Sequence, residues 1–128
     1  MDSPYNGITF CTGSLGADRN NDLVKMAAKY AAMGRVHFLH ARNIRFLPQE
    51  DGKLFFHESP HITECGSLDI YGILKALHDN GFCGYVRPDH GRNIWGEDGR
   101  PGYGLYDRAL GSMYLSGLWE GIDKTENA

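Results

Sequence analysis

Three residues of kinds that bind metal ions stand at the ends of three apolar runs in the sequence: Cys11, His40 and Asp89. About one βα unit separates each from the next, and in a parallel sheet such positions meet at the edge where ligands bind. A thiolate, an imidazole and a carboxylate together suit a divalent transition ion such as Mn²⁺, Fe²⁺, Co²⁺ or Zn²⁺. Spacing alone equally allows Cys11 and His40 to be packed core residues and Asp89 to be a hydrogen-bonding loop residue.

The elements that must position these side chains follow from the hydrophobic pattern. Strands are predicted in the runs 7–11, 35–40 and 82–90. Within the third run the strand should end at Pro88, because proline cannot donate to a sheet ladder. Helices are predicted around residues 23–31 and 70–77, with apolar residues at i, i+3, i+4 and i+7, and around residues 105–118, with apolar residues at helical spacing. Their expected caps are Asn20, Asn21 or Asp22, Gly34, Ser67 and Gly81.

Loops connect these elements. Residues 12–16 are predicted to be a loop, and a longer one, with a hairpin around Asp51-Gly52, lies between the second strand and the second helix. A loop of that size inside a domain is more often functional than accidental. A glycine-rich loop follows at residues 91–104, and residues 124–128 are expected to be a frayed tail within the final segment 119–128.

Strands that alternate with helices predict an α/β fold with a parallel sheet, either an open doubly wound sheet or a (β/α)₈ barrel. A complete barrel needs about 250 residues, and the chain has 128. We therefore expect residues 1–128 to form a single unit that would be roughly half of a barrel.

Composition argues against nucleic-acid binding, a membrane span and a disulfide framework. With 13 Lys and Arg against 16 Asp and Glu, no basic excess favours a nucleic-acid partner. No run approaches the ~20 apolar residues of a membrane span, and residues 1–7 lack the pattern of a signal peptide, so we expect a cytoplasmic chain without membrane contact. The three cysteines include no CxxC pair, so they indicate neither a disulfide framework nor a zinc ribbon.

Further polar and aromatic residues gather around the expected strand ends. His90 directly follows Asp89 and could transfer protons near neutral pH. Guanidinium groups suit a substrate carboxylate, although ordinary loop salt bridges are the alternative; those near the site are Arg42, Arg87, Arg92 and Arg100. Three aromatic residues could form a lid or simply pack at a helix start: Trp95, Tyr103 and Tyr106.

Four segments carry a family resemblance: residues 10–16 (FCTGSLG), 37–43 (HFLHARN), 87–92 (RPDHGR) and 100–111 (RPGYGLYDRALG). In order and spacing they resemble the C-terminal part of mannonate dehydratase. The resemblance extends from Asp2 to Trp119. A sugar isomerase of the same superfamily fits the third and fourth segments less well.

The resemblance implies a xylose-isomerase-like TIM barrel, of which this chain would hold about three C-terminal βα units. It implies a hydro-lyase that dehydrates D-mannonate to 2-keto-3-deoxy-D-gluconate in hexuronate (glucuronate) catabolism, with Mn²⁺ or Fe²⁺ as cofactor. The corresponding metal ligands are Cys11, His40 and Asp89, and the catalytic acid/base groups are His90 and Tyr103, whose division of roles stays open. We expect substrate contacts from Arg42, His61 and Arg92, with a surface role as the alternative for His61.

Members of this family are full barrels with a further histidine ligand on an upstream strand. We therefore keep a second hypothesis, in which the chain is a catalytically incomplete fragment or one half of a split barrel. The missing strands would then come from a homo-oligomer or a partner chain, and an unpaired sheet edge would favour such association.

Overall fold

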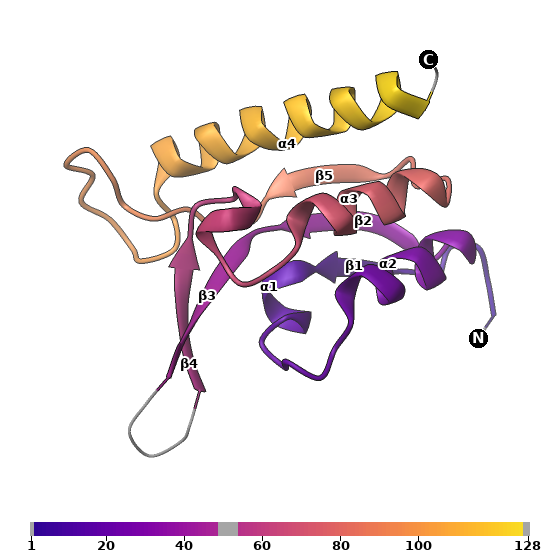
Figure 1. Cartoon of the computed structure of the whole chain (residues 1–128), viewed down its shortest axis with the longest axis horizontal. Helices are drawn as coiled ribbons and strands as arrows, with labels where there is room; N and C mark the ends of the chain where they lie inside the picture. Colours follow the sequence, from indigo (N-terminus) through magenta and orange to yellow (C-terminus); the bar gives the residue numbers. More distant parts are fainter. Residues whose placement is uncertain (1, 49–53, 127–128) are drawn as a thin grey trace.

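The computed structural model describes residues 2–48 and 54–126. Its centre is a parallel sheet in the order β1-β2-β5 (Figure 1), made of β1 (Ile8–Cys11), β2 (Val36–Ala41) and β5 (Tyr85–Pro88). The register pairs Cys11 with His40 and His40 with Arg87. The α/β class and the three parallel strands predicted from the sequence are therefore confirmed.

Two helices pack side by side on one face of this sheet (Figure 1): α2 (Leu23–Ala32) and α3 (Ile70–Asp79). The Asp22 side chain accepts a hydrogen bond from the Lys25 amide and so caps α2, as predicted. The expected cap Ser67 is wrong for α3. Asp69 caps that helix through the Gly72 amide at 2.9 Å, because Ser67 Oγ instead accepts from the Phe46 amide at 3.1 Å.

A hairpin projects from the sheet (Figure 1) and consists of β3 (Asn43–Pro48) and antiparallel β4 (Leu54–Ser59). The predicted hairpin is thus confirmed in its strands, while its turn around Asp51-Gly52 lies outside the described residues. A short 3₁₀ turn, η1 (Thr63–Cys65), leads on toward α3. The predicted loop at residues 12–16 is corrected, since it contains a single helical turn, α1 (Thr12–Leu15).

The long final helix α4 (Leu105–Glu126) lies beside β5 and α3 (Figure 1). It begins at the predicted residue but extends further than expected, since residues 124–126 are helical rather than frayed. Residues 127 and 128 lie outside the described part of the chain. Before α4, residues 91–104 form turns joined by a bridge between Gly91 and Tyr103.

The core lies between the sheet and its helices. Phe10 of β1 and Leu39 of β2 are fully buried and belong to one cluster with Ala27, Ile73 and Leu77 of the helices. Burying such a side chain is worth about 1.5–3 kcal/mol. Because successive strand residues point to opposite faces, this core directs the neighbouring Cys11 and His40 to the face away from α2 and α3.

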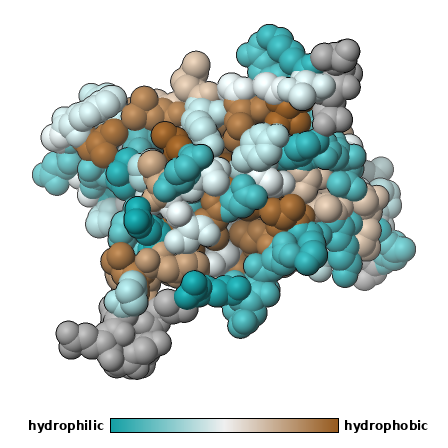
Figure 2. Space-filling view, in the orientation of Figure 1, coloured by the Kyte–Doolittle hydropathy of each residue, from teal (hydrophilic) through white to brown (hydrophobic). Residues whose placement is uncertain are grey.

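The surface in Figure 2 shows hydrophobic residues gathered below α4, where a groove of about 740 Å³ runs between α4 and the α3–β5 segment. Apolar side chains in its lining include Leu74, Phe82, Val86, Leu115 and Trp119. Within residues 2–48 and 54–126, no helix combines the length and hydropathy that a membrane crossing requires.

Two glycines, one just after a helix and one inside a helix, allow a test of backbone conformation. At Gly34 and Gly117 an added Cβ would meet no described heavy atom within 4 Å, yet Gly34 has φ +64° and Gly117 lies inside α4. We expect Gly34→Ala to lower the free energy of unfolding by about 1–2 kcal/mol. Gly117→Ala should raise it by about 0.5–1 kcal/mol. Urea unfolding measures both, and shifts of the same sign would contradict this explanation.

Candidate metal centre

The three residues identified by their spacing converge in the structure. One ligand atom each of Cys11, His40 and Asp89 lies within 4.8 Å of the other two. Cys11 Sγ is 3.5 Å from Asp89 Oδ2, and His40 Nδ1 is 3.2 Å from Asp89 Oδ1. These separations fit three donors around a single ion with bonds of about 2.0–2.3 Å, and the mixed donor set suits a divalent transition ion.

Backbone contacts bring the strand ends together. Cys11 ends β1, His40 is the penultimate residue of β2, and Asp89 follows β5, whose pairing it extends by donating its amide to Ala41 O at 3.1 Å. Thr12 Oγ1 accepts from the Arg42 amide at 2.8 Å and donates to the Arg42 carbonyl at 2.6 Å. This buried hydroxyl therefore fixes the end of β1 to the end of β2.

Polar neighbours orient the donor atoms. The Ser14 hydroxyl, on the single turn α1, donates to Cys11 Sγ at 3.1 Å. Burial disfavours the charged form of Asp89, but the Arg87 hydrogen bond and the nearby His40 and His90 outweigh it, so the Asp89 pKa lies below its ordinary value. The carboxylate is thus ionised at neutral pH, as a metal ligand must be.

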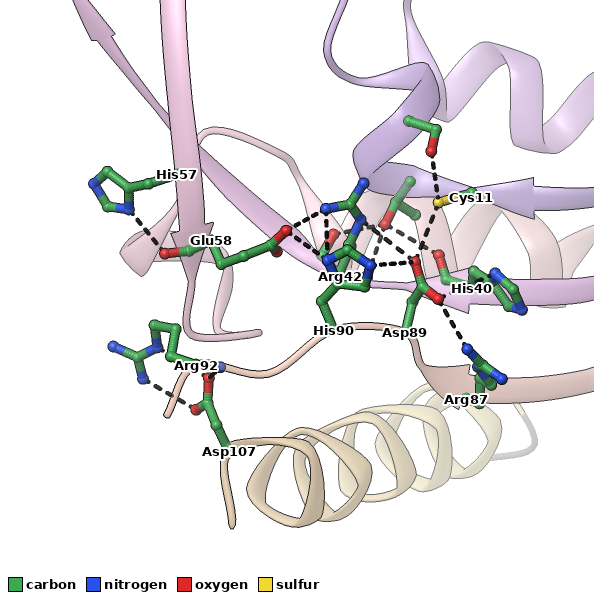
Figure 3. A network of polar contacts seen from close by, with 12 residues as sticks. Cys11, His40, Arg42, His57, Glu58, Arg87, Asp89, His90, Arg92 and Asp107 are labelled. Atoms are coloured by element: carbon green, nitrogen blue, oxygen red, sulfur yellow. Dashed lines mark hydrogen bonds and ion pairs between the residues drawn. The ribbon is translucent and has the colours of Figure 1, made fainter. Parts of the chain in front are cut away.

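The Arg42 guanidinium lies at the centre of this network (Figure 3). Its Nε is 3.5 Å from Asp89 Oδ2, and its Nη1 pairs with the Glu58 carboxylate. The side chain is only 10% exposed and packs so closely on α1 that a Cβ at Gly13 would overlap it. Glycine is therefore required at position 13, and a buried cation balances two carboxylates.

His90 and Tyr103 are also brought together. Their ring centroids are 5.8 Å apart, and the Arg100 guanidinium lies 4.7 Å from the centroid of the Tyr103 ring. The Gly91 amide donates to the Gly102 carbonyl at 3.0 Å, which closes the glycine-rich loop beside His90. Gly102 has φ +86°, a conformation that favours glycine.

The aromatic residues expected to form a lid divide into two groups. Trp95 packs against Tyr106, with ring centroids 5.6 Å apart, whereas Tyr103 lies with His90. Trp95 is 73% exposed and has φ +53°, which is unusual for a residue with a side chain. A lid function stays a prediction.

Two of the residues expected to contact substrate have protein partners apart from the triad, and a substrate contact for them stays a prediction. Arg92 binds Asp107 at the start of α4 through Nε at 2.9 Å and Nη2 at 3.0 Å, apart from the triad (Figure 3). His61 is 4% exposed and packs so tightly on α4 that a Cβ at Gly111 would overlap its ring. Both side chains join α4 to the rest of the protein.

Sequence reasoning missed Glu58, which reaches the site from β4 and contacts both Arg42 and His90. A charged residue near the end of the predicted hairpin was the available signal, but its partners lie 16 and 32 residues away. Nothing in a local pattern identifies partners at such separations.

Comparison with known proteins shows which family this arrangement belongs to. The sequence model of the D-mannonate dehydratase (UxuA) family matches residues 1–128. The chain belongs to the D-mannonate dehydratase family. A mannonate dehydratase of Lactococcus lactis subsp. lactis (strain IL1403) is 58% identical over 125 residues, which cover 98% of this chain and 34% of the relative.

Other D-mannonate dehydratases give the same result. The Thermotoga maritima protein is 57% identical over 124 residues, covering 97% of this chain and 33% of the relative. The crystal structure of mannonate dehydratase from Streptococcus suis serotype 2 matches with a TM-score of 0.88 and 40% identity, over 99% of this chain and 35% of that chain. The chain thus spans about a third of the length of these family members.

The buried His61 should make stability depend on pH. Burial lowers its pKa and outweighs the nearby Asp107 carboxylate and the Ala41 backbone, which both favour the charged ring. Below the ordinary histidine pKa of about 6.5, the unfolded chain therefore binds a proton that the folded chain does not. The free energy of unfolding should fall with decreasing pH, by up to about 1.4 kcal/mol per pH unit.

Urea unfolding at pH 7.5 and pH 5.5 measures this effect. His61→Gln should reduce the pH dependence, whereas His57→Gln, at an exposed histidine of β4, should leave it unchanged. Equal pH dependence in the wild type and His61→Gln would contradict the explanation.

Proposed function

We propose that this chain carries the metal-binding and proton-transfer residues of a mannonate dehydratase, a hydro-lyase that converts D-mannonate to 2-keto-3-deoxy-D-gluconate in hexuronate catabolism. The observation that carries this proposal is the Cys11–His40–Asp89 triad at the strand ends of a family member. His40 and Asp89 would hold Mn²⁺ or Fe²⁺ together with the Cys11 thiolate. When bound, such an ion stabilises negative charge that develops on substrate oxygens.

The residues beside the triad supply the proton transfers. The reaction removes the proton from C2 of a 2-hydroxy acid and expels the C3 hydroxyl as water, leaving an enol that tautomerises to the 2-keto product. One group must therefore accept a proton and another must donate one. We assign these steps to His90 and Tyr103, whose rings are neighbours. His90 directly follows Asp89 in the chain, and the bridge between Gly91 and Tyr103 brings Tyr103 beside it.

Of the three residues expected to contact substrate, Arg42 is the one whose position supports that role. It lies beside both Asp89 and His90, and its Nε has an ion pair but no hydrogen bond within the described residues. Arg92 and His61 instead join α4 to the rest of the protein, as described above. We therefore propose a substrate contact for Arg42, while contacts from Arg92 and His61 stay predictions from the family resemblance.

We further propose that residues 1–128 form a single unit, a section of a (β/α)₈ barrel containing about three C-terminal βα units. The parallel order β1-β2-β5 and the match to 35% of a solved mannonate dehydratase support this. Within the described residues β1 and β5 each have one partner strand. The alternative is an incomplete fragment or half of a split barrel, completed by a homo-oligomer or a partner chain.

The ligand assignment predicts the effect of removing the thiolate. Cys11→Ser should weaken Mn²⁺ binding by more than about tenfold without unfolding the chain, since it replaces a soft donor with a poor one. Isothermal titration calorimetry measures the affinity, with Cys83→Ser, at an exposed cysteine outside the triad, as the matched control. Unchanged affinity in Cys11→Ser would refute the assignment.

The activity itself is tested by incubating the reduced chain with Mn²⁺ and D-mannonate and measuring the 2-keto-3-deoxy product. Tyr103→Phe should lower turnover by about 10²–10⁴-fold while sparing metal content, whereas Tyr5→Phe, at a highly exposed tyrosine, should not. Near-normal turnover in Tyr103→Phe would remove this residue from the mechanism. If only a full-length relative turns over, the result favours the incomplete-fragment alternative.

A further inference from the structure

Glu58 is a charged residue of the hairpin that extends into the candidate active site (Figure 3). Its Oε1 lies 2.7 Å from His90 Nδ1 and also pairs with Arg42 Nη1. The side chain is 21% exposed, so water screens these contacts only partly. The adjacent His57 points away from the site and contacts the Glu58 carbonyl at 2.8 Å (Figure 3).

Two neighbours of His90 Nδ1 favour opposite tautomers. Arg42 Nη1 lies 3.1 Å away and can only donate, so it would pair with an unprotonated Nδ1. Glu58 Oε1 lies closer, at 2.7 Å, and an ionised carboxylate can only accept. An unprotonated Nδ1 would place two lone pairs against each other at that distance. Because the shorter contact involves the charged acceptor, Glu58 decides the tautomer.

We infer that Glu58 is a positioning residue that holds the proton of neutral His90 on Nδ1 and leaves Nε2 unprotonated. Nε2 is 3.7 Å from Asp89 Oδ2, beyond hydrogen-bond distance, so the metal-centre carboxylate does not occupy it. This inference rests on the proposed function and adds the division of roles to it. His90 would accept the substrate proton at Nε2, and Tyr103 would then be the proton donor.

Arg42 supports this arrangement from the other side. Its guanidinium, buried against Gly13, balances the charges of both Glu58 and Asp89 and so allows two carboxylates to be close together. Arg42 and Glu58 thereby attach the hairpin to the sheet at the site. The long connection between β2 and α3 therefore contributes a residue that orients the chemistry.

The tautomer can be measured directly, without turnover. Long-range ¹H–¹⁵N spectra of the ¹⁵N-histidine-labelled chain near pH 8 distinguish a protonated from an unprotonated ring nitrogen, and the signal missing in His90→Gln identifies His90. We expect the Nδ1–H tautomer in the wild type, both without added metal and with Zn²⁺, a diamagnetic ion that the same donors accept. An Nε2–H tautomer in the wild type would overturn the inference.

Substitutions of Glu58 sharpen the test. Glu58→Ala leaves Arg42 as the neighbour of Nδ1 and should convert His90 to the Nε2–H tautomer. Glu58→Gln retains an acceptor oxygen at the same length and should keep Nδ1–H, so it also serves if the alanine variant fails to fold. Glu64→Gln, at an exposed glutamate in η1, is the matched control and should leave the spectrum of His90 unchanged.

The two proposals fail separately. If the chain converts D-mannonate but His90 carries its proton on Nε2, the inference about Glu58 is wrong and the proposed function stands. If His90 has the Nδ1–H tautomer but a complete, metal-loaded site does not act on D-mannonate, the function fails and the positioning by Glu58 is upheld. Where turnover occurs, Glu58→Ala should lower kcat by about 10²–10⁴-fold with a smaller change in KM, and Glu58→Gln should lower it less.

Discussion

The alternation of side chains along β1 and β2 is the constraint on which the site depends. Phe10 and Leu39 are fully buried in the core that α2 and α3 cover, so their neighbours Cys11 and His40 must face the other side of the sheet. The parallel register then pairs those two residues and places Asp89 after the adjacent strand. A register shift of one residue would bury the donors and expose the core.

The second organising interaction is electrostatic. A single buried guanidinium, that of Arg42, lies between the Asp89 and Glu58 carboxylates and is accommodated by the missing side chain at Gly13. Without this cation, two carboxylates would repel each other in a partly buried site. The same contact attaches the hairpin to the sheet, so the stability of the fold and the charge balance of the site are linked.

Membership of the D-mannonate dehydratase family and the geometry of the site support each other, although they come from different observations. The chain spans about a third of its relatives, and the described residues include three strand-end donors, a pair of proton-transfer candidates and a carboxylate next to one of them. These groups come from the ends of all three parallel strands and from the segments that follow β2 and β5, as is usual at the carboxyl ends of parallel strands.

The sequence alone was enough to predict the three parallel strands, the helices around residues 23–31, 70–77 and 105–118, most of their caps, and the position of Cys11, His40 and Asp89 at the strand ends. These follow from hydrophobic period, turn chemistry and residue type, which act over a few residues. Only the tertiary structure decided that Asp69 rather than Ser67 caps α3, that Arg92 binds Asp107, that His61 is buried, and that Glu58 contacts His90. Those features depend on which side chains meet after folding, and contacts between distant segments have no local pattern in the sequence.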